Sequence, residues 1–249
     1  MNEVPVVDGV VLVHGGTCAA DIWDEVLPML SFPAVAVDLP GRGSNPADLA
    51  TVTLDDCVAA VLDAADAAGF RQFALVGHSM GGVTITETAY RHPERVRSVI
   101  YLAALVPTQE VSAARLVTGG DMPSGVMSRM PEEMSKALFA NDLTDAQWAS
   151  VAARLVDDSF TILNATVSGH PLDSHRAYIG LARDIPVPPA LVDAMVGVLG
   201  PDLDRRTLDT GHMIMNSQPE LLAAVLAEVV RARPEAPRTA HDQHAEIHA

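Results

Sequence analysis

The chain has 249 residues, of which 49% are hydrophobic, and its formal net charge is −16. This length and composition predict a single domain with a large core. The acidic charge argues against nucleic acid or an anionic membrane as a partner, so we expect a small-molecule substrate. Two cysteines are too few for a disulfide framework or a metal cluster, and we expect no metal and no cofactor.

The start of the chain lacks the basic residues and the apolar core of a signal peptide. No apolar run reaches the ~18–20 residues that a membrane-spanning helix needs. We therefore expect a soluble cytoplasmic protein, either a monomer or a homodimer. Alanine is abundant and Lys136 is the only lysine, which is typical of a high-GC bacterial genome.

The first part of the chain alternates short apolar stretches with helical patterns. Strands are expected over residues 6–13, 34–37, 73–76 and 98–105, and helices over residues 22–30, 53–68 and 83–92. Thr53 is a typical N-cap, with acidic residues in the turn that follows, and Gly69 ends that helix. Strands and helices that alternate through short loops predict a parallel sheet covered on both faces.

The alternation stops between Pro107 and His175. Two helical patterns lie here, over residues 131–141 and 145–156, without a clear strand. Four methionines, which adapt to irregular apolar pockets, add to the pattern: Met122, Met127, Met130 and Met134. The segment predicts a helical lid, inserted after the strand that ends near Leu105. We expect at least half of these methionines to fill the lid's own small core.

The alternation then resumes, with strands expected over residues 177–181 and 203–208 and helices over residues 189–199 and 219–231. The resulting fold class is α/β, with about six mostly parallel strands flanked by helices. Residues 1–106 and 176–233 form this core, and residues 107–175 form the lid. Residues 234–249, which contain prolines and spaced histidines, are expected to be a disordered tail.

The most informative motif is the G-x-S-x-G sequence of residues 77–81, between a predicted strand and a predicted helix. A sharp strand-to-helix turn strains the serine backbone, exposes its Oγ and points the helix N-terminus at the reacting centre. Gly77 and Gly81 are needed there, because a β-carbon would collide with the neighbouring strand or helix. Ser79 is therefore the candidate nucleophile, and a third glycine, Gly82, supports this interpretation.

A serine nucleophile needs a base, and the base needs an acid that orients it. On this type of fold the acid and then the histidine follow the serine along the chain. His212 lies between the last predicted strand and the last predicted helix, and we expect it to be the base. Asp184 follows the strand over residues 177–181 and is the expected acid. Glu110 is the alternative, because some enzymes of this type take the acid from the loop after the preceding strand.

An oxyanion hole requires two backbone N–H groups aimed at the position where negative charge develops. Met80, directly after the nucleophile, is expected to supply one, and Gly16, in the loop after the first strand, the other. His14 is expected to brace this loop through side-chain hydrogen bonds. His78 is expected to pack beside the nucleophile and not to act as a second base. Arg42 is expected to cap or pair locally and not to bind phosphate.

Four stretches together resemble the α/β-hydrolase superfamily, over nearly all of residues 6–230. They are Val11-Leu12-Val13-His14-Gly15, Asp38-Leu39-Pro40-Gly41-Arg42-Gly43, Gly77-His78-Ser79-Met80-Gly81-Gly82 and Gly211-His212-Met213. Residues 101–107, 178–184 and 208–213 are similar to one branch of it. That branch holds plant methyl-ester esterases, of the salicylic-acid-binding and methylketone-synthase type, and hydroxynitrile lyases. The resemblance implies about six parallel strands and places the acid at Asp184.

Two departures from this branch bear on the reaction. The cyanohydrin-cleaving members carry a threonine directly after the oxyanion-loop histidine and a lysine directly after the catalytic histidine. Those places hold Gly15 and Met213 here. Without a hydroxyl to hold the cyanohydrin and a cation to stabilise departing cyanide, the resemblance favours the esterase members.

We therefore expect a serine hydrolase that cleaves a small, uncharged, largely apolar carboxylic ester or lactone through an acyl-enzyme. The substrate pocket is expected to contain Gly15, Cys18, His78, Met122, Met127, Met130 and Met213. Two alternatives stay open. A lyase, decarboxylase or cyclase would use the same three side chains as a proton shuttle. A ligand-binding protein on a hydrolase scaffold would not use them at all, and the presence of all three disfavours it.

Overall fold

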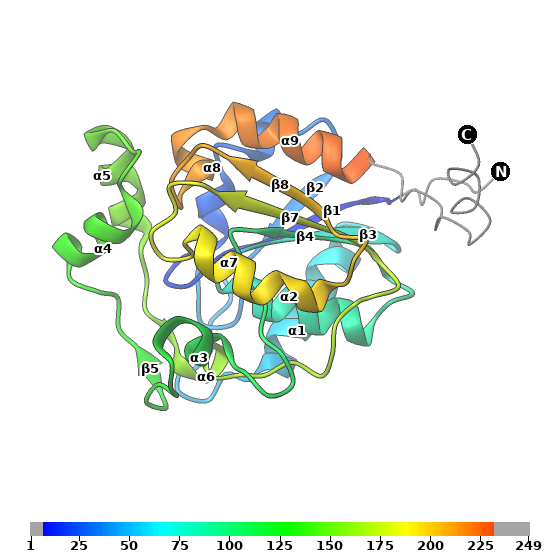
Figure 1. Ribbon diagram of the computed structural model, residues 1–249, viewed down its shortest axis with the longest axis horizontal. Helices are drawn as coiled ribbons and strands as arrows, with labels where there is room; N and C mark the ends of the chain where they lie inside the picture. The colour runs from blue at the N-terminus through cyan, green and yellow to red at the C-terminus, as the bar shows by residue number, and fades with distance from the viewer. Residues whose placement is uncertain (1–6, 232–249) are drawn as a thin grey trace, which may run out of the picture.

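A six-stranded parallel sheet forms the centre of the computed structural model, which describes residues 7–231 (Figure 1). The strands are β1 (Gly9–Val13), β2 (Ala34–Val37), β3 (Phe73–His78), β4 (Val96–Leu102), β7 (His175–Leu181) and β8 (Asp204–Leu208). Their order is β2-β1-β3-β4-β7-β8, and every neighbouring pair is parallel. The predicted α/β fold with about six strands is confirmed. The predicted tail, residues 234–249, lies outside the described residues.

Helices cover both faces of this sheet (Figure 1). The main ones are α1 (Leu54–Ala67), α2 (Gly81–Arg91), α7 (Pro189–Met195), α8 (Ile214–Ser217) and α9 (Pro219–Arg231). Side chains of β1 alternate between two cores, as those of a strand covered on both faces must. Val11 and Val13 pack into the core that contains Ile85 of α2, whereas Leu12 packs into the core that contains Leu226 of α9.

The start and the end of α1 agree with the sequence analysis. Thr53 Oγ1 accepts a hydrogen bond from the Asp56 N–H (3.2 Å), and the Asp56 carboxylate accepts one from the Thr53 N–H (2.9 Å). This reciprocal capping box satisfies two N–H groups that a helix start leaves without partners. Gly69, just past the helix, has a φ of +77°, a conformation that glycine adopts without steric cost.

Between β4 and β7 the chain leaves the sheet and forms what we call the inserted segment, residues 107–174. It contains α3 (Ala113–Thr118), β5 (Val126–Met127), α4 (Glu132–Phe139), α5 (Asp145–Arg154), β6 (Asp158–Ser159) and α6 (Phe160–Leu163). The two expected helices are present as α4 and α5, and Figure 1 shows them beyond one end of the sheet. The structure also contains an antiparallel pair of strands, β5 and β6, where no strand is expected from the sequence. The sequence does not show them, because strands of two residues leave no alternating pattern.

The helix expected over residues 22–30 is wrong. The chain forms two short 3₁₀ helices there, η1 (Ala20–Trp23) and η2 (Leu27–Met29). Pro28 has no N–H to donate and interrupts a longer helix at this point. Ile22, Trp23 and Val26 are buried in the core. Their spacing along the chain resembles that of an α-helix, which explains the wrong prediction.

Element ends differ from the expected ones at several places. β4 ends at Leu102 and not at residue 105, because Ala103 has a φ of +44°, which is incompatible with a strand. β1 begins at Gly9, and residues 7 and 8 are not part of it, whereas residue 6, the expected first residue, lies outside the described residues. His175, expected in the lid, begins β7. The helix expected over residues 189–199 divides into α7 and a 3₁₀ turn over its last four residues.

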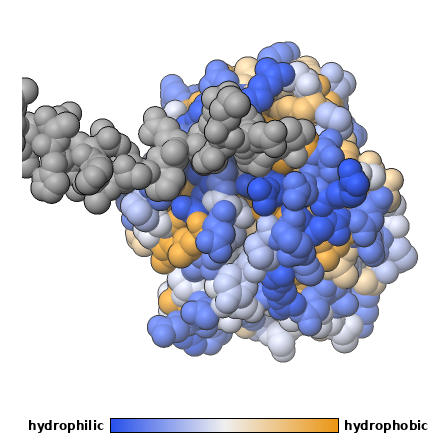
Figure 2. All heavy atoms as spheres, turned by 90° about the vertical axis from the view of Figure 1, so that its right-hand side faces the viewer, coloured by the Kyte–Doolittle hydropathy of each residue, from blue (hydrophilic) through white to orange (hydrophobic). Residues whose placement is uncertain are grey.

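Within residues 7–231, no helix is both long and apolar enough to cross a membrane. Viewed from the amino ends of the strands, the surface is mostly hydrophilic, and the hydrophobic areas visible there are small and separate (Figure 2). The carboxyl ends of the strands lie on the opposite side, and the candidate active site is found there, as in other parallel α/β sheets.

Close approach of the backbone explains the glycines around the G-x-S-x-G turn. A β-carbon on Gly77 would lie 2.7 Å from Ile85 Cδ1, and one on Gly81 would lie 2.6 Å from the His14 carbonyl oxygen. The expectation that side chains would collide at these two positions is confirmed. Removing the β-carbons allows α2 to sit directly on β3 and β1.

Replacing Gly82 with alanine is expected to lower the free energy of unfolding by about 3 kcal/mol, or to prevent folding. The new β-carbon would overlap the carbonyl oxygen of Leu105, a backbone atom that cannot rotate away. Gly197 is a matched control, because it is exposed and a β-carbon there meets no atom within 4 Å. Urea unfolding measures both variants, and equal midpoints would contradict the prediction.

Candidate active site

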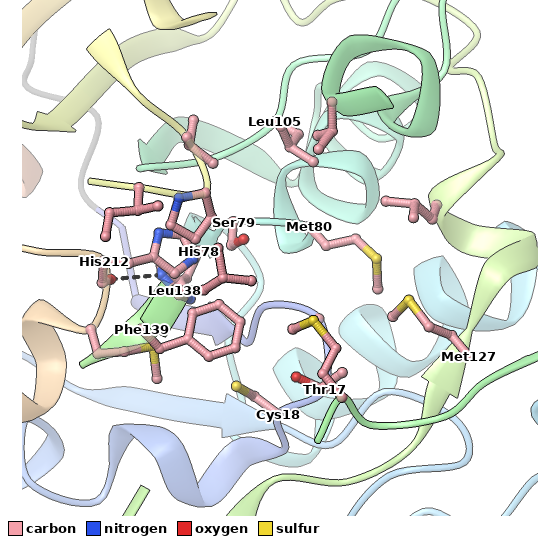
Figure 3. A pocket seen from close by; sticks show the side chains of 18 of the residues that line it. Thr17, Cys18, His78, Ser79, Met80, Leu105, Met127, Leu138, Phe139 and His212 are labelled. Carbon is pink, nitrogen blue, oxygen red and sulfur yellow. Dashed lines mark hydrogen bonds between the residues drawn. The ribbon is translucent and has the colours of Figure 1, made fainter. Parts of the chain in front are cut away.

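The turn between β3 and α2 holds Ser79 in the left-handed region, with a φ of +53°. Non-glycine residues rarely adopt this conformation, and it is the strained turn that the sequence predicts. The Ser79 N–H donates to the Leu102 carbonyl (3.2 Å), and the Ser79 carbonyl accepts from the N–H groups of Gly82 (3.1 Å) and Leu105 (2.9 Å). These three bonds fix the strained backbone, and the residue lines a cavity (Figure 3).

Two neighbouring strands bring His212 and Asp184 together, since His212 follows β8 and Asp184 follows β7. His212 Nδ1 lies 2.7 Å from Asp184 Oδ2, and both side chains are buried. The other Asp184 oxygen accepts from the Val187 N–H (2.7 Å). A carboxylate at Nδ1 requires that nitrogen to carry the proton, which leaves Nε2 free to accept another. Glu110 is exposed, so the structure pairs Asp184, and not this alternative acid, with His212.

The hydrogen bonds of His212 within residues 7–231 go to Asp184 and, through its carbonyl, to His78. None joins its ring to the Ser79 hydroxyl, although both residues line the same cavity. Contacts between a nucleophile and its base are often loose in a free enzyme and tighten when substrate binds. Proton transfer from Ser79 to His212 therefore requires a side-chain rotation that brings the hydroxyl within hydrogen-bond distance of the ring.

Two rings pack on His212. His78 Nε2 donates to the His212 carbonyl (3.1 Å), and the two ring centroids are 4.5 Å apart. Burial, and next to it the neighbouring His212, lower the pKa of His78 well below its ordinary range, so His78 is a neutral donor. Phe139, at the end of α4, stacks on the His212 ring with centroids 5.7 Å apart. His78 thus packs beside the nucleophile as expected, whereas the sequence analysis does not identify Phe139.

Gly16 and Met80, the two expected oxyanion donors, lie next to each other. A β-carbon on Gly16 would be 3.6 Å from the end of the Met80 side chain. Both residues line the cavity, and neither N–H donates to another group among residues 7–231. Met80 is buried and Gly16 partly buried, and two N–H groups without protein partners at one cavity wall are what an oxyanion hole requires.

His14 braces the loop that leads to Gly16, as the sequence analysis expects. Its Nε2 accepts from the Leu39 N–H (3.3 Å), so its Nδ1 carries the proton and donates to the Gly15 carbonyl (2.8 Å). Burial lowers the pKa of His14 to about 4, and the neighbouring Arg42 acts in the same direction. The side chain is therefore neutral wherever the protein is folded near neutral pH.

We expect acid to destabilise the protein through His14. Its pKa falls from 6.5 in a model peptide to about 4 in the folded chain, so only the unfolded chain binds the proton as pH falls between these values. Between pH 7 and pH 4, the free energy of unfolding is expected to fall by on the order of 3 kcal/mol through this residue. Urea midpoints at several pH values measure it. A His14→Asn variant should show a smaller loss than a His92→Asn control, and identical losses would contradict the prediction.

The cavity above Ser79 has a volume of ≈ 540 Å³ and is mainly apolar. Its wall comes from the loop after β1, from the inserted segment and from the loop between β7 and α7 (Figure 3). Among the described residues, no Asp, Glu, Lys or Arg side chain lines it. Burial raises the pKa of Cys18, which lies in the wall, to about 12, so its thiol is uncharged as well.

Five of the seven expected pocket residues line this cavity, namely Cys18, His78, Met127, Met130 and Met213. The other two do not. Gly15 is buried behind the nucleophile, where a β-carbon would lie 2.9 Å from Ser79 Cβ. Met122 is held elsewhere, because its N–H and carbonyl both bond to the Asn164 side chain, each at 2.9 Å.

Several wall residues are not identified from the sequence. They are Thr17, Leu105, Leu116, Val117, Ser128, Leu138, Phe139, Leu163, Ile185, Pro186, Val187, Pro188 and Leu191. Most lie in the inserted segment or in the loop after Asp184. The apolar end of the helix expected over residues 131–141 is the one signal for Leu138 and Phe139, and it does not show which way they face.

The strand order and the serine turn at the carboxyl end of β3 define a class of enzymes, the α/β hydrolases. Residues 10–225 match the model of the alpha/beta hydrolase family, and the chain therefore belongs to that family. The superfamily inferred from the sequence motifs is confirmed, and so is the prediction that the chain is an enzyme of the α/β-hydrolase type.

A pyrethroid hydrolase and a methylesterase are among the curated relatives that match the chain over most of its length. Pyrethroid hydrolase of Sphingobium wenxiniae is 26% identical over 261 residues, which cover 94% of this chain and 91% of the relative. Methylesterase 7 of Arabidopsis thaliana is 29% identical over 250 residues, covering 88% and 95%. The crystal structure of a pyrethroid hydrolase from Sphingobium faniae JZ-2 superposes with a TM-score of 0.79. That structure is 24% identical and covers 91% of this chain and 98% of its own, which confirms the fold.

Proposed function

We propose that this protein hydrolyses a small, uncharged, largely apolar carboxylic ester or lactone through a covalent acyl-enzyme. The observation that carries the proposal is the cavity of ≈ 540 Å³, whose wall within residues 7–231 contains Ser79 and His212 and no Asp, Glu, Lys or Arg. The volume lies within the range of small-molecule sites, about 300–1,000 Å³. A charged substrate group would lose its hydration there without gaining a partner.

Each residue of the site has one task in the proposed reaction. Ser79 Oγ attacks the ester carbonyl while His212 Nε2 takes the hydroxyl proton, and the N–H groups of Gly16 and Met80 stabilise the oxyanion. The tetrahedral intermediate collapses, and His212 returns the proton to the departing alcohol. Water then attacks the acyl-enzyme with His212 as the base again, and the acid is released. Asp184 keeps Nδ1 protonated and stabilises the imidazolium in both steps.

The relatives support ester hydrolysis. Among the curated relatives that match most of this chain are one named as a pyrethroid hydrolase and one named as a methylesterase. Pimeloyl-[acyl-carrier protein] methyl ester esterase of Neisseria meningitidis is 36% identical over 124 residues, which cover 47% of this chain and 41% of the relative. The names that contain a methyl ester or a methylesterase support ester hydrolysis, and the choice of an uncharged ester rests on the uncharged cavity wall alone.

The proposal is tested by hydrolysis of p-nitrophenyl acetate and p-nitrophenyl butyrate, with mono-p-nitrophenyl succinate as a charged ester of comparable length. We expect turnover of the two neutral esters and little of the succinate. A fluorophosphonate probe, which labels activated serines, is applied in parallel. Labelling of Ser79 without ester turnover would favour a lyase or cyclase that uses the triad as a proton shuttle. If the protein shows no labelling and no turnover, a binding protein is favoured.

A further inference from the structure

A buried ion pair joins the inserted segment to the loop after β2. Arg42 lies in that loop, Asp158 begins β6, and both side chains are fully buried. Arg42 Nη2 contacts Asp158 Oδ1, while Arg42 Nη1 donates to the Pro40 carbonyl (2.5 Å) in its own loop. The bond to Pro40 is the local contact expected from the sequence, whereas the ion pair with Asp158 is a long-range contact that the sequence does not predict. Because burying two charges is unfavourable unless each has further partners, the other contacts of Asp158 are informative.

The second oxygen of Asp158 binds the loop that contains Gly16. Oδ2 accepts from the Thr17 N–H (2.7 Å). On the other side of the same residue, the Thr17 carbonyl accepts from the Val156 N–H (2.9 Å). Asp158 Oδ1 also accepts from the Ser159 N–H (2.6 Å), so the carboxylate is itself fixed. The inserted segment therefore holds both backbone polar groups of Thr17.

Thr17 has a φ of +57°, in the left-handed region. A β-branched residue is a genuine outlier there, and such a conformation persists only where the surroundings impose it. The bonds from Asp158 and Val156 impose it here. The Thr17 N–H belongs to the peptide group between Gly16 and Thr17, which the bond to Asp158 therefore fixes. The Gly16 N–H belongs to the peptide group before it, whose Gly15 carbonyl is held by His14. Only the φ and ψ angles of Gly16 lie between these two fixed peptide groups. The Thr17 N–H is occupied by Asp158, whereas the Gly16 N–H has no partner among residues 7–231.

We propose that Asp158, held in place by Arg42, is a positioning residue for the oxyanion hole. It fixes Thr17 in the left-handed region together with the Gly16–Thr17 peptide group, and so prevents the rotation about the Gly16 backbone that would turn the Gly16 N–H away from the reacting carbonyl oxygen. Asp158 acts only through Thr17, since it does not line the cavity. This inference rests on the proposed function, specifically on Gly16 as an oxyanion donor.

A pair of double variants separates positioning from a merely structural role. Arg42→Met/Asp158→Leu removes both charges and fills the space, but it leaves the Thr17 N–H without an acceptor. Arg42→Met/Asp158→Asn removes the same charges and keeps an amide oxygen for that N–H. The readouts are kcat and KM for p-nitrophenyl butyrate and the dissociation constant of phenylboronic acid. This probe forms a tetrahedral adduct with an active serine and places an oxygen in the oxyanion hole.

For the Arg42→Met/Asp158→Leu double variant, we expect kcat to fall about 10²-fold, with KM changed less than about threefold. The dissociation constant of phenylboronic acid should rise by a similar factor. Arg42→Met/Asp158→Asn should retain most of both. Equal kcat and equal boronate affinity in the two double variants would overturn the proposal. If a double variant does not fold, the single Asp158→Leu and Asp158→Asn variants are compared in the same way, and equal boronate affinity in these two overturns the proposal.

The control is Asp121→Asn, which breaks an exposed ion pair with Arg115 in the same inserted segment. It should leave kcat and boronate affinity unchanged. Failure of the proposed function is recognised separately. If the wild-type protein does not turn over esters, the boronate still reports the oxyanion hole on Ser79, and Ser79→Ala removes the adduct in either case.

Discussion

Replacing Ser79 with alanine is expected to lower kcat for p-nitrophenyl acetate and butyrate by about 10⁶-fold, close to the background rate. The left-handed backbone of Ser79 and its three backbone hydrogen bonds hold one oxygen nucleophile at the cavity wall. Without the hydroxyl, His212 has no proton to accept and no acyl-enzyme can form. Residual catalysis would come only from binding and from the oxyanion donors.

The measurement compares initial rates of wild-type and variant at equal concentration, with intact-mass detection of the acyl-enzyme as a second readout. Melting temperatures show that the variant is folded, and we expect no loss of stability, because alanine removes only a cavity-facing hydroxyl from a partly exposed residue. Turnover that survives the substitution would refute Ser79 as the nucleophile.

Replacing Asp184 with asparagine is expected to lower kcat by about 10⁴-fold at neutral pH, with the fold retained. The Val187 N–H already occupies Oδ1, so the amide oxygen of asparagine would stay there and its NH₂ group would face His212. A donor at that position forces Nδ1 of His212 to become an acceptor and places the proton on Nε2. In that tautomer the imidazole cannot take the proton of Ser79.

Two further variants make the Asp184 result specific. Asp209→Asn changes an exposed aspartate of the same region, paired with Arg183 at 3.1 Å, and should leave kcat within about twofold. Glu110→Gln removes the alternative acid, which is exposed, and should have as little effect. A large loss in Glu110→Gln together with a small loss in Asp184→Asn would contradict the assignment.

The sequence predicts the core of the site because its signals are local. A short apolar strand, three glycines and a helical pattern surround Ser79. Chain order then indicates His212 as the base, and it leaves Asp184 as the expected acid with Glu110 as the alternative. These residues follow three strands of one parallel sheet, whose carboxyl ends meet at a common edge. The fold class and the order of these residues along the chain are therefore enough to predict that they lie together, and the structure of the inserted segment is not needed for that prediction.

The rest of the site depends on contacts that leave no local pattern. Thr17 bonds to a carboxylate 141 residues away, and nothing around either residue marks the pair. A threonine gives no sign of a positive φ, because glycine is the residue that usually signals one. Phe139 belongs to an amphipathic helix, and only the packing of that helix decides that its last residue stacks on His212. Pro28 is different, because the sequence does show the cause. The apolar spacing predicts a helix over residues 22–30, but the missing N–H of the proline prevents it.

The Arg42–Asp158 pair also limits how the protein can be re-engineered. Exchange of the inserted segment between relatives is an obvious route to new substrate ranges, because that segment supplies much of the cavity wall. A donor segment without an acid at position 158 would leave Arg42 buried and unpaired, which costs about 3–5 kcal/mol. Typical domains have only about 5–15 kcal/mol of stability in total. A chimaera of this protein therefore needs to take the loop after β2 and the inserted segment from the same relative.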